Sequence, residues 1–144
     1  MMTGTVRKGF SLMEIMIAVT IMAVLAVGAV RFFGGQLDKS KRTSTVTTLQ
    51  VTDGAIEQYH LDTGKYPESL ADLSRKPYDD NVARSWGGPY FKQAQKNPDY
   101  IPVDGWKSEV QYRLNDPGTS PRYEVYSFGP NGEDAPEDEW IYAQ

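Results

Sequence analysis

The stretch that decides the fold runs from Lys8 to Val30 and reads KGFSLMEIMIAVTIMAVLAVGAV. Between Phe10 and Val30 the only charged residue is Glu14. As a helix with a rise of about 1.5 Å per residue, this part would span roughly 31 Å, close to the bilayer core of about 30 Å. The stretch therefore predicts a helix that is long and apolar enough to cross a membrane.

The charges ahead of this segment give it an orientation. Arg7 and Lys8 are the only charged residues before Glu14. By the positive-inside rule we expect this end to stay in the cytoplasm and the C-terminal part to be exported.

The residues of the segment leave three interpretations open: a secretory signal peptide, a plain membrane anchor, or an anchor that is later extracted and packed against copies of itself. A signal peptide has a shorter apolar region and small residues at its cleavage site, whereas Phe32 and Phe33 follow here. Glu14 favours the third interpretation, because a carboxylate in hydrocarbon is costly unless it snorkels, takes up a proton or has a positive partner. Cleavage between Gly9 and Phe10 would create such a partner, the α-amine of Phe10, one helical turn before Glu14.

Composition argues against several classes of protein. The net charge is −4, from 15 basic and 19 acidic residues, which is not the basic signature of a nucleic-acid binder. Cysteine is absent and His60 is the single histidine, so disulfides, thiolate metal sites and multi-histidine zinc sites are excluded. We assign His60 no function and expect it to be half-buried. We expect the acid pair Asp79–Asp80 to lie in a solvent-exposed loop.

The next segment predicts a second helical region. Gly34–Gly35 could end the first helix or let it bend. Beyond them, a three-to-four spacing of apolar residues predicts an amphipathic helix over Asp38–Leu61, with Gly64 near its end. The residues on its apolar face are Val46, Leu49, Ile56 and Tyr59/His60.

The C-terminal half predicts a small sheet. All nine prolines lie from Pro67 onward. Residues 68–73 read as one or two helical turns, and the remainder to residue 88 reads as loop. Period-two alternation predicts strands over Glu109–Leu114 and Tyr123–Phe128, joined by a turn at Asn115–Gly118. An antiparallel sheet packed on the amphipathic helix would close this half of the chain.

The string KGFSLME before the apolar run resembles the leader of type IV pilins and type II secretion pseudopilins. The resemblance implies that residues 1–9 are a leader peptide and that a prepilin peptidase cuts between Gly9 and Phe10. It also implies N-methylation of Phe10 and a role for Glu14 in subunit assembly. Ser11 stands where the family usually has threonine.

Four later segments narrow the resemblance to the major pseudopilins of type II secretion systems. They are YHLDTGKYP (59–67), WGGPY (86–90), VDGW (103–106) and YSFGPNG (126–132). The implied fold is α+β and type IV pilin-like, with a long N-terminal helix packed on a small antiparallel sheet and a calcium-binding C-terminal loop. The implied regions are a transmembrane and assembly helix (10–33), an amphipathic half of that helix (34–65) and a periplasmic globular domain (66–144).

The acidic loop, residues 131–139, reads NGEDAPEDE and carries five carboxylates and no base. On its own it predicts a solvated acidic tail or a site for a hard cation such as Ca²⁺. The resemblance implies that Ca²⁺ binds here and orders the C-terminal region. The implied ligands are the Phe128 carbonyl and the side chains of Asn131, Asp134 and Asp138, with Glu133 as a further candidate.

The implied function is that of a structural subunit and not of an enzyme. Copies would leave the inner membrane and polymerise into a periplasmic pseudopilus, a helical homopolymer that drives folded proteins across the outer membrane. The implied partners are minor pseudopilins, the prepilin peptidase, an inner-membrane assembly platform, a cytoplasmic ATPase and, before assembly, membrane lipid; no nucleic acid is expected. Alternatives are a type IV pilin or minor pseudopilin for adhesion, motility or DNA uptake, a membrane-anchored periplasmic enzyme, or a binding module on a monomeric anchor.

Overall fold

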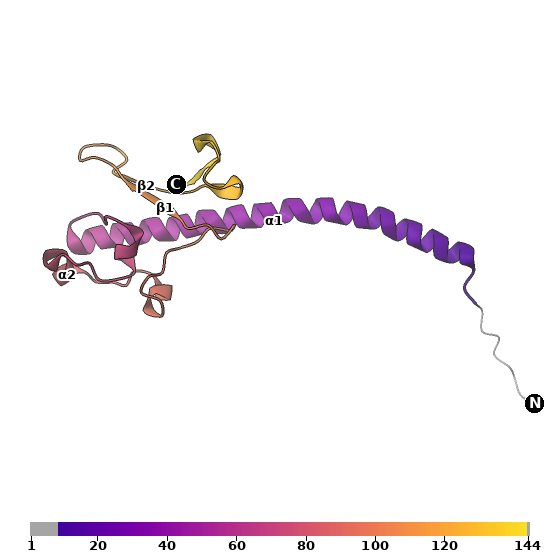
Figure 1. Cartoon of the computed structure of the whole chain (residues 1–144), viewed down its shortest axis with the longest axis horizontal. Coiled ribbons are helices and arrows are strands. Elements are labelled where there is room, and N and C mark those ends of the chain that lie inside the picture. The colour runs from indigo at the N-terminus through magenta and orange to yellow at the C-terminus, as the bar shows by residue number, and fades with distance from the viewer. Residues whose placement is uncertain (1–8, 144) are drawn as a thin grey trace, which may run out of the picture. The chain divides into compact units, whose positions relative to one another are not determined.

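A computed structural model describes residues 9–143, including side chains except those of residues 30–34 (Figure 1). Arg7, Lys8 and the rest of the expected leader up to residue 8 lie outside the described residues. The chain divides into two compact units, Met1–Asp38 and Lys39–Gln144.

Helix α1 extends from Leu12 to Thr63 and continues through Gly34–Gly35 (Figure 1). The glycine pair therefore does not end the helix. Each glycine costs about 1 kcal/mol relative to alanine, but extending a helix that is already formed adds a hydrogen bond for each residue that is fixed. The predicted end is confirmed: Gly64 takes a left-handed φ of 72°, and its N–H donates to the His60 carbonyl at 2.8 Å.

The core of the second unit forms around the C-terminal half of α1. Leu49 and Ile56 are fully buried and Tyr59 nearly so, which confirms the predicted apolar face. His60 is half-buried as expected, with its ring stacked on Tyr66 at a centroid distance of 4.0 Å. The short helices, loops and strands that cover this face contribute further core residues: Leu70, Leu73, Val82, Phe91, Ala94, Val110, Val125 and Ile141.

Three short helices connect α1 to the sheet: η1 (Leu70–Leu73), α2 (Asp80–Ser85) and η2 (Lys92–Gln95). The first confirms the predicted helical turn. The second replaces the loop that the sequence predicted at Asp79–Asp80. Asp79 caps α2, because its side chain accepts from the Asn81 N–H at 2.9 Å. This hydrogen bond is the main cause of the lowered pKa of Asp79. A helix of six residues is too short for apolar periodicity to reveal it.

The sheet has three antiparallel strands in the order β1 (Gln111–Leu114), β2 (Tyr123–Ser127) and β3 (Ile141–Tyr142). Both predicted strands are confirmed with shorter bounds. The predicted turn begins the loop between them, where Gly118 has a φ of 91°. The two-residue β3 is not apparent from the sequence, because it is too short to show alternation. The register places Arg113 opposite Glu124 and Tyr126 opposite Tyr142.

Two of the recognised segments tie loops to α1. In WGGPY, the Tyr90 hydroxyl donates to Asp62 Oδ2 at 2.8 Å. In VDGW, the Gly105 N–H donates to Thr45 Oγ1 at 2.9 Å. A Cβ at position 105 would lie 2.4 Å from the Lys41 carbonyl oxygen, so this close approach of backbone to helix requires glycine.

Candidate assembly segment and acidic loop

The first unit presents an apolar helix surface. Within residues 9–143, one helical segment, Leu12–Ala29, is long and apolar enough to cross a bilayer. None of that segment is buried inside the described structure, and Met13 is 71% exposed. An exposed apolar surface of this extent marks contact with lipid or with other protein chains.

The polar groups of this segment are arranged to suit an apolar surrounding. Thr20 Oγ1 donates to the Met16 carbonyl at 2.8 Å, so its hydroxyl is satisfied within the helix. Glu14 lies in the first turn of α1, where the partial positive charge of the helix N-terminus favours a carboxylate. Within the described residues of this segment, Glu14 is therefore the only charged side chain, and the other side chains suit a hydrocarbon environment.

The expected processing site precedes the helix. Gly9 and Phe10 are both exposed and non-helical, and α1 begins two residues beyond Phe10, at Leu12. The peptide bond between Gly9 and Phe10 is therefore accessible to a peptidase without unwinding α1. The structure places Gly9, Phe10 and Glu14 together within one short segment at the start of the apolar helix.

The acidic loop, residues 131–139, begins at the last residue of η3 (Gly129–Asn131) and ends with η4 (Glu137–Glu139). Within the loop, Asn131 Nδ2 donates to Glu139 Oε2 at 2.6 Å. The expected ligands Glu133, Asp134 and Asp138 are exposed.

The donor set of the loop fits calcium by its chemistry. Carboxylate, amide and backbone carbonyl oxygens are the hard donors that Ca²⁺ prefers, and residues 128–138 carry all three kinds. In the described part of the chain, no group of three or more acidic or histidine side chains comes close enough to hold a metal ion. An ion in this loop would therefore depend on Asn131 and the Phe128 carbonyl in addition to carboxylates.

A buried carboxylate supports the start of the loop. Asp104 is 5% exposed, and its Oδ2 accepts from Ser127 Oγ at 2.6 Å. Its Oδ1 accepts from the backbone N–H groups of Trp106 and Ser108 at 2.8 and 2.9 Å. Ser127 Oγ in turn accepts from the Gly129 N–H at 3.0 Å. This role of Asp104 is not predicted from the sequence, although an Asp followed by glycine is a turn signal.

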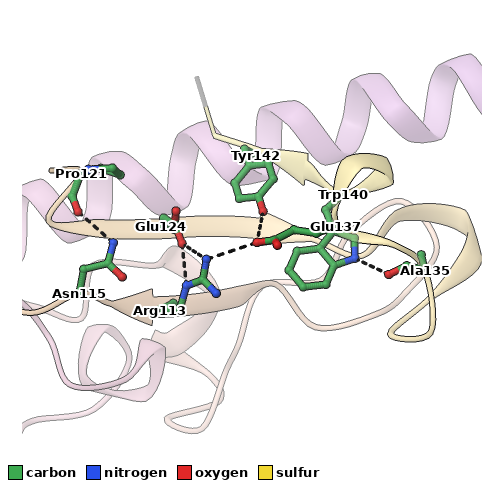
Figure 2. Close-up of polar contacts among 8 residues, drawn as sticks. All are labelled: Arg113, Asn115, Pro121, Glu124, Ala135, Glu137, Trp140 and Tyr142. Carbon is green, nitrogen blue, oxygen red and sulfur yellow. Dashed lines mark hydrogen bonds and ion pairs between the residues drawn. The ribbon is translucent and has the colours of Figure 1, made fainter. Parts of the chain in front are cut away.

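Arg113 is a second residue that the sequence analysis missed. Its Nε donates to Glu124 Oε2 at 2.7 Å, and a guanidinium nitrogen lies 3.5 Å from Glu137 Oε1 (Figure 2). The same Glu137 oxygen accepts from the Tyr142 hydroxyl at 3.2 Å. The pKa of Arg113 is raised, mainly by Glu124, and that of Tyr142 is raised by burial and then by Glu137. The pairing of the two predicted antiparallel strands could have suggested the contact of Arg113 with Glu124. The contact with Glu137 depends on how the acidic loop folds back onto the sheet.

An apolar N-terminal helix that continues into the core of a domain with a small antiparallel sheet defines a pilin-like protein. Two family profiles agree with this class. The profile described as "Prokaryotic N-terminal methylation motif" matches residues 5–30. The profile described as "Type II secretion system (T2SS), protein G" matches residues 33–142. The chain belongs to this type II secretion system protein G family.

Curated relatives and a solved structure agree with this assignment. The "Type II secretion system core protein G" of Klebsiella pneumoniae is 32% identical over 130 residues, which cover 88% of this chain and 86% of the relative. The protein of the same name from Xanthomonas campestris pv. campestris is 34% identical over 127 residues, covering 88% and 80%. The crystal structure of the major pseudopilin from the type 2 secretion system of enterohaemorrhagic Escherichia coli matches with a TM-score of 0.57 and 26% identity, covering 75% of this chain and 86% of that one.

Proposed function

We propose that this chain is a structural subunit of the pseudopilus of a type II secretion system. The observation that carries the proposal is α1, whose first part exposes an apolar surface and whose last part forms the core of a folded unit. Such a subunit can be held in lipid by one end and can pack against its copies through the same end. Head-to-tail contacts that do not close on themselves then give a filament.

In this proposal the newly made subunit is a single-pass protein of the inner membrane, and its C-terminal domain lies in the periplasm. The prepilin peptidase cuts between Gly9 and Phe10 and methylates Phe10. An assembly platform in the inner membrane and a cytoplasmic ATPase then add copies to a filament that also contains minor pseudopilins. Growth of the filament drives folded proteins across the outer membrane.

Glu14 sets the axial register in this proposal. Leaving the bilayer exchanges lipid contacts for helix contacts, so the net apolar gain is small. A pair between Glu14 and the Phe10 amine of a neighbour is strongest in the water-poor centre of a filament. The family assignment favours the pseudopilus over a type IV pilin for adhesion, motility or DNA uptake.

Replacing Glu14 by glutamine in the full chain tests the proposal. We expect Glu14→Gln to lower filament yield and cargo export about tenfold or more, because loss of one partner from a buried charge pair costs a few kcal/mol. The matched control is Glu68→Gln, the same chemical change at an exposed position of the second unit. Unchanged export with Glu14→Gln would contradict the assembly role of Glu14. The proposed processing has its own test: mass spectrometry of the membrane-extracted protein should find a chain that starts at methylated Phe10.

We also propose that the acidic loop binds Ca²⁺ through the Phe128 carbonyl, Asn131, Asp134 and Asp138, with Glu133 as a further candidate ligand. The hard oxygen donors of this loop support the proposal. Because Asn131 uses its amide nitrogen for Glu139, its amide oxygen is left for an ion. The bound ion would offset the repulsion among the exposed carboxylates and stabilise the C-terminal region.

The melting temperature of the full chain in detergent tests calcium binding. We expect millimolar Ca²⁺ to raise it by several degrees, because a ligand that binds only the folded state stabilises that state. Asp138→Asn should reduce the shift, and Glu68→Gln should leave it unchanged. An unchanged melting temperature in millimolar Ca²⁺ would leave the loop as a solvated acidic segment.

A further inference from the structure

We propose that Arg113 is the positioning residue of the acidic loop and docks it onto the sheet before any ion binds. In this proposal Arg113, Glu137, Tyr142 and Trp140 form a clamp, and we use that name for these four residues. The clamp orders the loop with side chains of the chain itself. The inference does not rest on calcium binding.

The charged part of the clamp joins two strands to the loop. Arg113 on β1 bridges Glu124 on β2 and Glu137 at the start of η4 (Figure 2). Tyr142 on β3 donates to the same carboxylate of Glu137. A shared guanidinium fixes two carboxylates at once, and such networks are worth more than isolated surface pairs.

The aromatic part of the clamp lies beside the charges. The Trp140 ring stacks on Tyr126 with a centroid distance of 4.8 Å and an interplanar angle of 3°. The Arg113 guanidinium carbon lies 6.0 Å from the centroid of the same Tyr126 ring, within the range of a cation–π contact. Trp140 Nε1 donates to the Ala135 carbonyl at 3.0 Å, which fixes the middle of the loop (Figure 2).

The chain beyond the loop is anchored as well. Ile141 is 6% exposed and belongs to the core. The Ala143 N–H donates to the Val125 carbonyl at 2.9 Å, which adds a backbone bond from the last described residue to β2. The clamp therefore acts on a loop whose C-terminal flank is already fixed to the sheet.

The clamp and the separate hydrogen bond from Asn131 divide the acids of the loop into two groups. Glu137 is held by Arg113 and Tyr142, and Glu139 is held by Asn131. The other group comprises Glu133, Asp134 and Asp138. All five carboxylates are exposed, so the two groups differ in their partners and not in their burial. One arginine thus offsets part of the repulsion that the acidic composition alone would suggest.

Amide hydrogen exchange of the full chain in detergent, with calcium chelated, tests the clamp. In the unaltered chain we expect residues 133–143 to be protected. Arg113→Gln should speed their exchange about fivefold, and Arg113→Lys less, because lysine keeps the charge but cannot bridge two carboxylates with one planar fork. The matched control is Arg75→Gln, because Arg75 pairs with the exposed Asp99 at 3.1 Å. This substitution should leave the exchange of residues 133–143 unchanged.

A double substitution separates docking from a general loss of stability. If Arg113 and Glu137 act on each other, Arg113→Gln combined with Glu137→Gln should speed exchange by less than the product of the two single effects. Should Arg113→Gln loosen the core of α1 as well, Arg113→Lys and Glu137→Gln decide instead. Two outcomes would overturn the proposal. One is fast exchange of residues 133–143 in the unaltered chain without calcium, and the other is an exchange rate that these variants leave unchanged. Addition of Ca²⁺ to the same samples tests calcium binding separately.

Discussion

At the scale of single residues, Tyr90 shows how one hydroxyl can join distant parts of the chain. It donates to Asp62 near the end of α1 and accepts from the Gly87 N–H at 3.1 Å. Burial, and then the hydrogen bond to Asp62, raise the pKa of Tyr90 from 10.0 to about 12. Burial raises the pKa of Tyr59 to about 12 in the same way. These phenols keep their protons in the folded chain at a pH where the unfolded chain loses them.

The raised pKa of Tyr90 predicts a loss of stability in alkali. The stabilisation linked to its proton is complete below pH 10 and is lost as the pH rises from about 10 through about 12. Tyr90→Phe should make the chain about 1 kcal/mol less stable near neutral pH, but should weaken the dependence on pH in that alkaline interval. Thermal unfolding across the interval measures both effects. Tyr78→Phe, at a residue that is 91% exposed, is the control and should leave the profile unchanged.

At the scale of elements, α1 buries two threonines that differ in their partners. Thr45 and Thr52 are both fully buried, and each hydroxyl donates to the carbonyl four residues back. Only Thr45 also accepts a hydrogen bond from another segment, the Gly105 N–H. Thr45 is therefore the one of these two threonines whose hydroxyl oxygen also binds the VDGW segment.

This difference predicts unequal effects of the same substitution. Thr45→Val should cost about 1–2 kcal/mol, because it leaves the Gly105 N–H without its partner. Thr52→Val keeps the shape of the side chain and should change the stability by about 0.5 kcal/mol or less. Denaturant unfolding of the full chain in detergent measures the free energies. Equal losses for the two variants would show that Gly105 does not depend on Thr45.

At the scale of the whole molecule, long patterns could be predicted from the sequence and short ones could not. The apolar run and the face of Leu49, Ile56 and Tyr59 extend over many turns, so periodicity reveals them. The six-residue α2 has a local cap and one buried residue, Val82, and the two-residue β3 depends on a partner strand from elsewhere in the chain. The strand β3 in particular exists only because Tyr126 and Ser127 lie alongside it.

The candidate sites follow the same rule. Gly9, Phe10 and Glu14 form one contiguous motif, so the sequence alone could single them out. The pair of Arg113 with Glu137 joins residues 24 positions apart in the sequence, and nothing in the local pattern of either residue indicates it. The acids of the loop could be recognised by composition, but the side chains that hold them could not.

The threonines of α1 have a consequence for the hydration of its outer surface. From Thr43 to Thr52 the helix carries no charged residue, and the exposed hydroxyls of Thr43 and Thr47 already donate to carbonyls of the preceding turn. The hydroxyl protons of Thr43 and Thr47 therefore do not depend on solvent for a partner. A second protein surface that packed on this part of the helix would displace water at little cost in enthalpy. Because no charge is involved, the affinity of that contact should depend on osmotic pressure far more than on ionic strength.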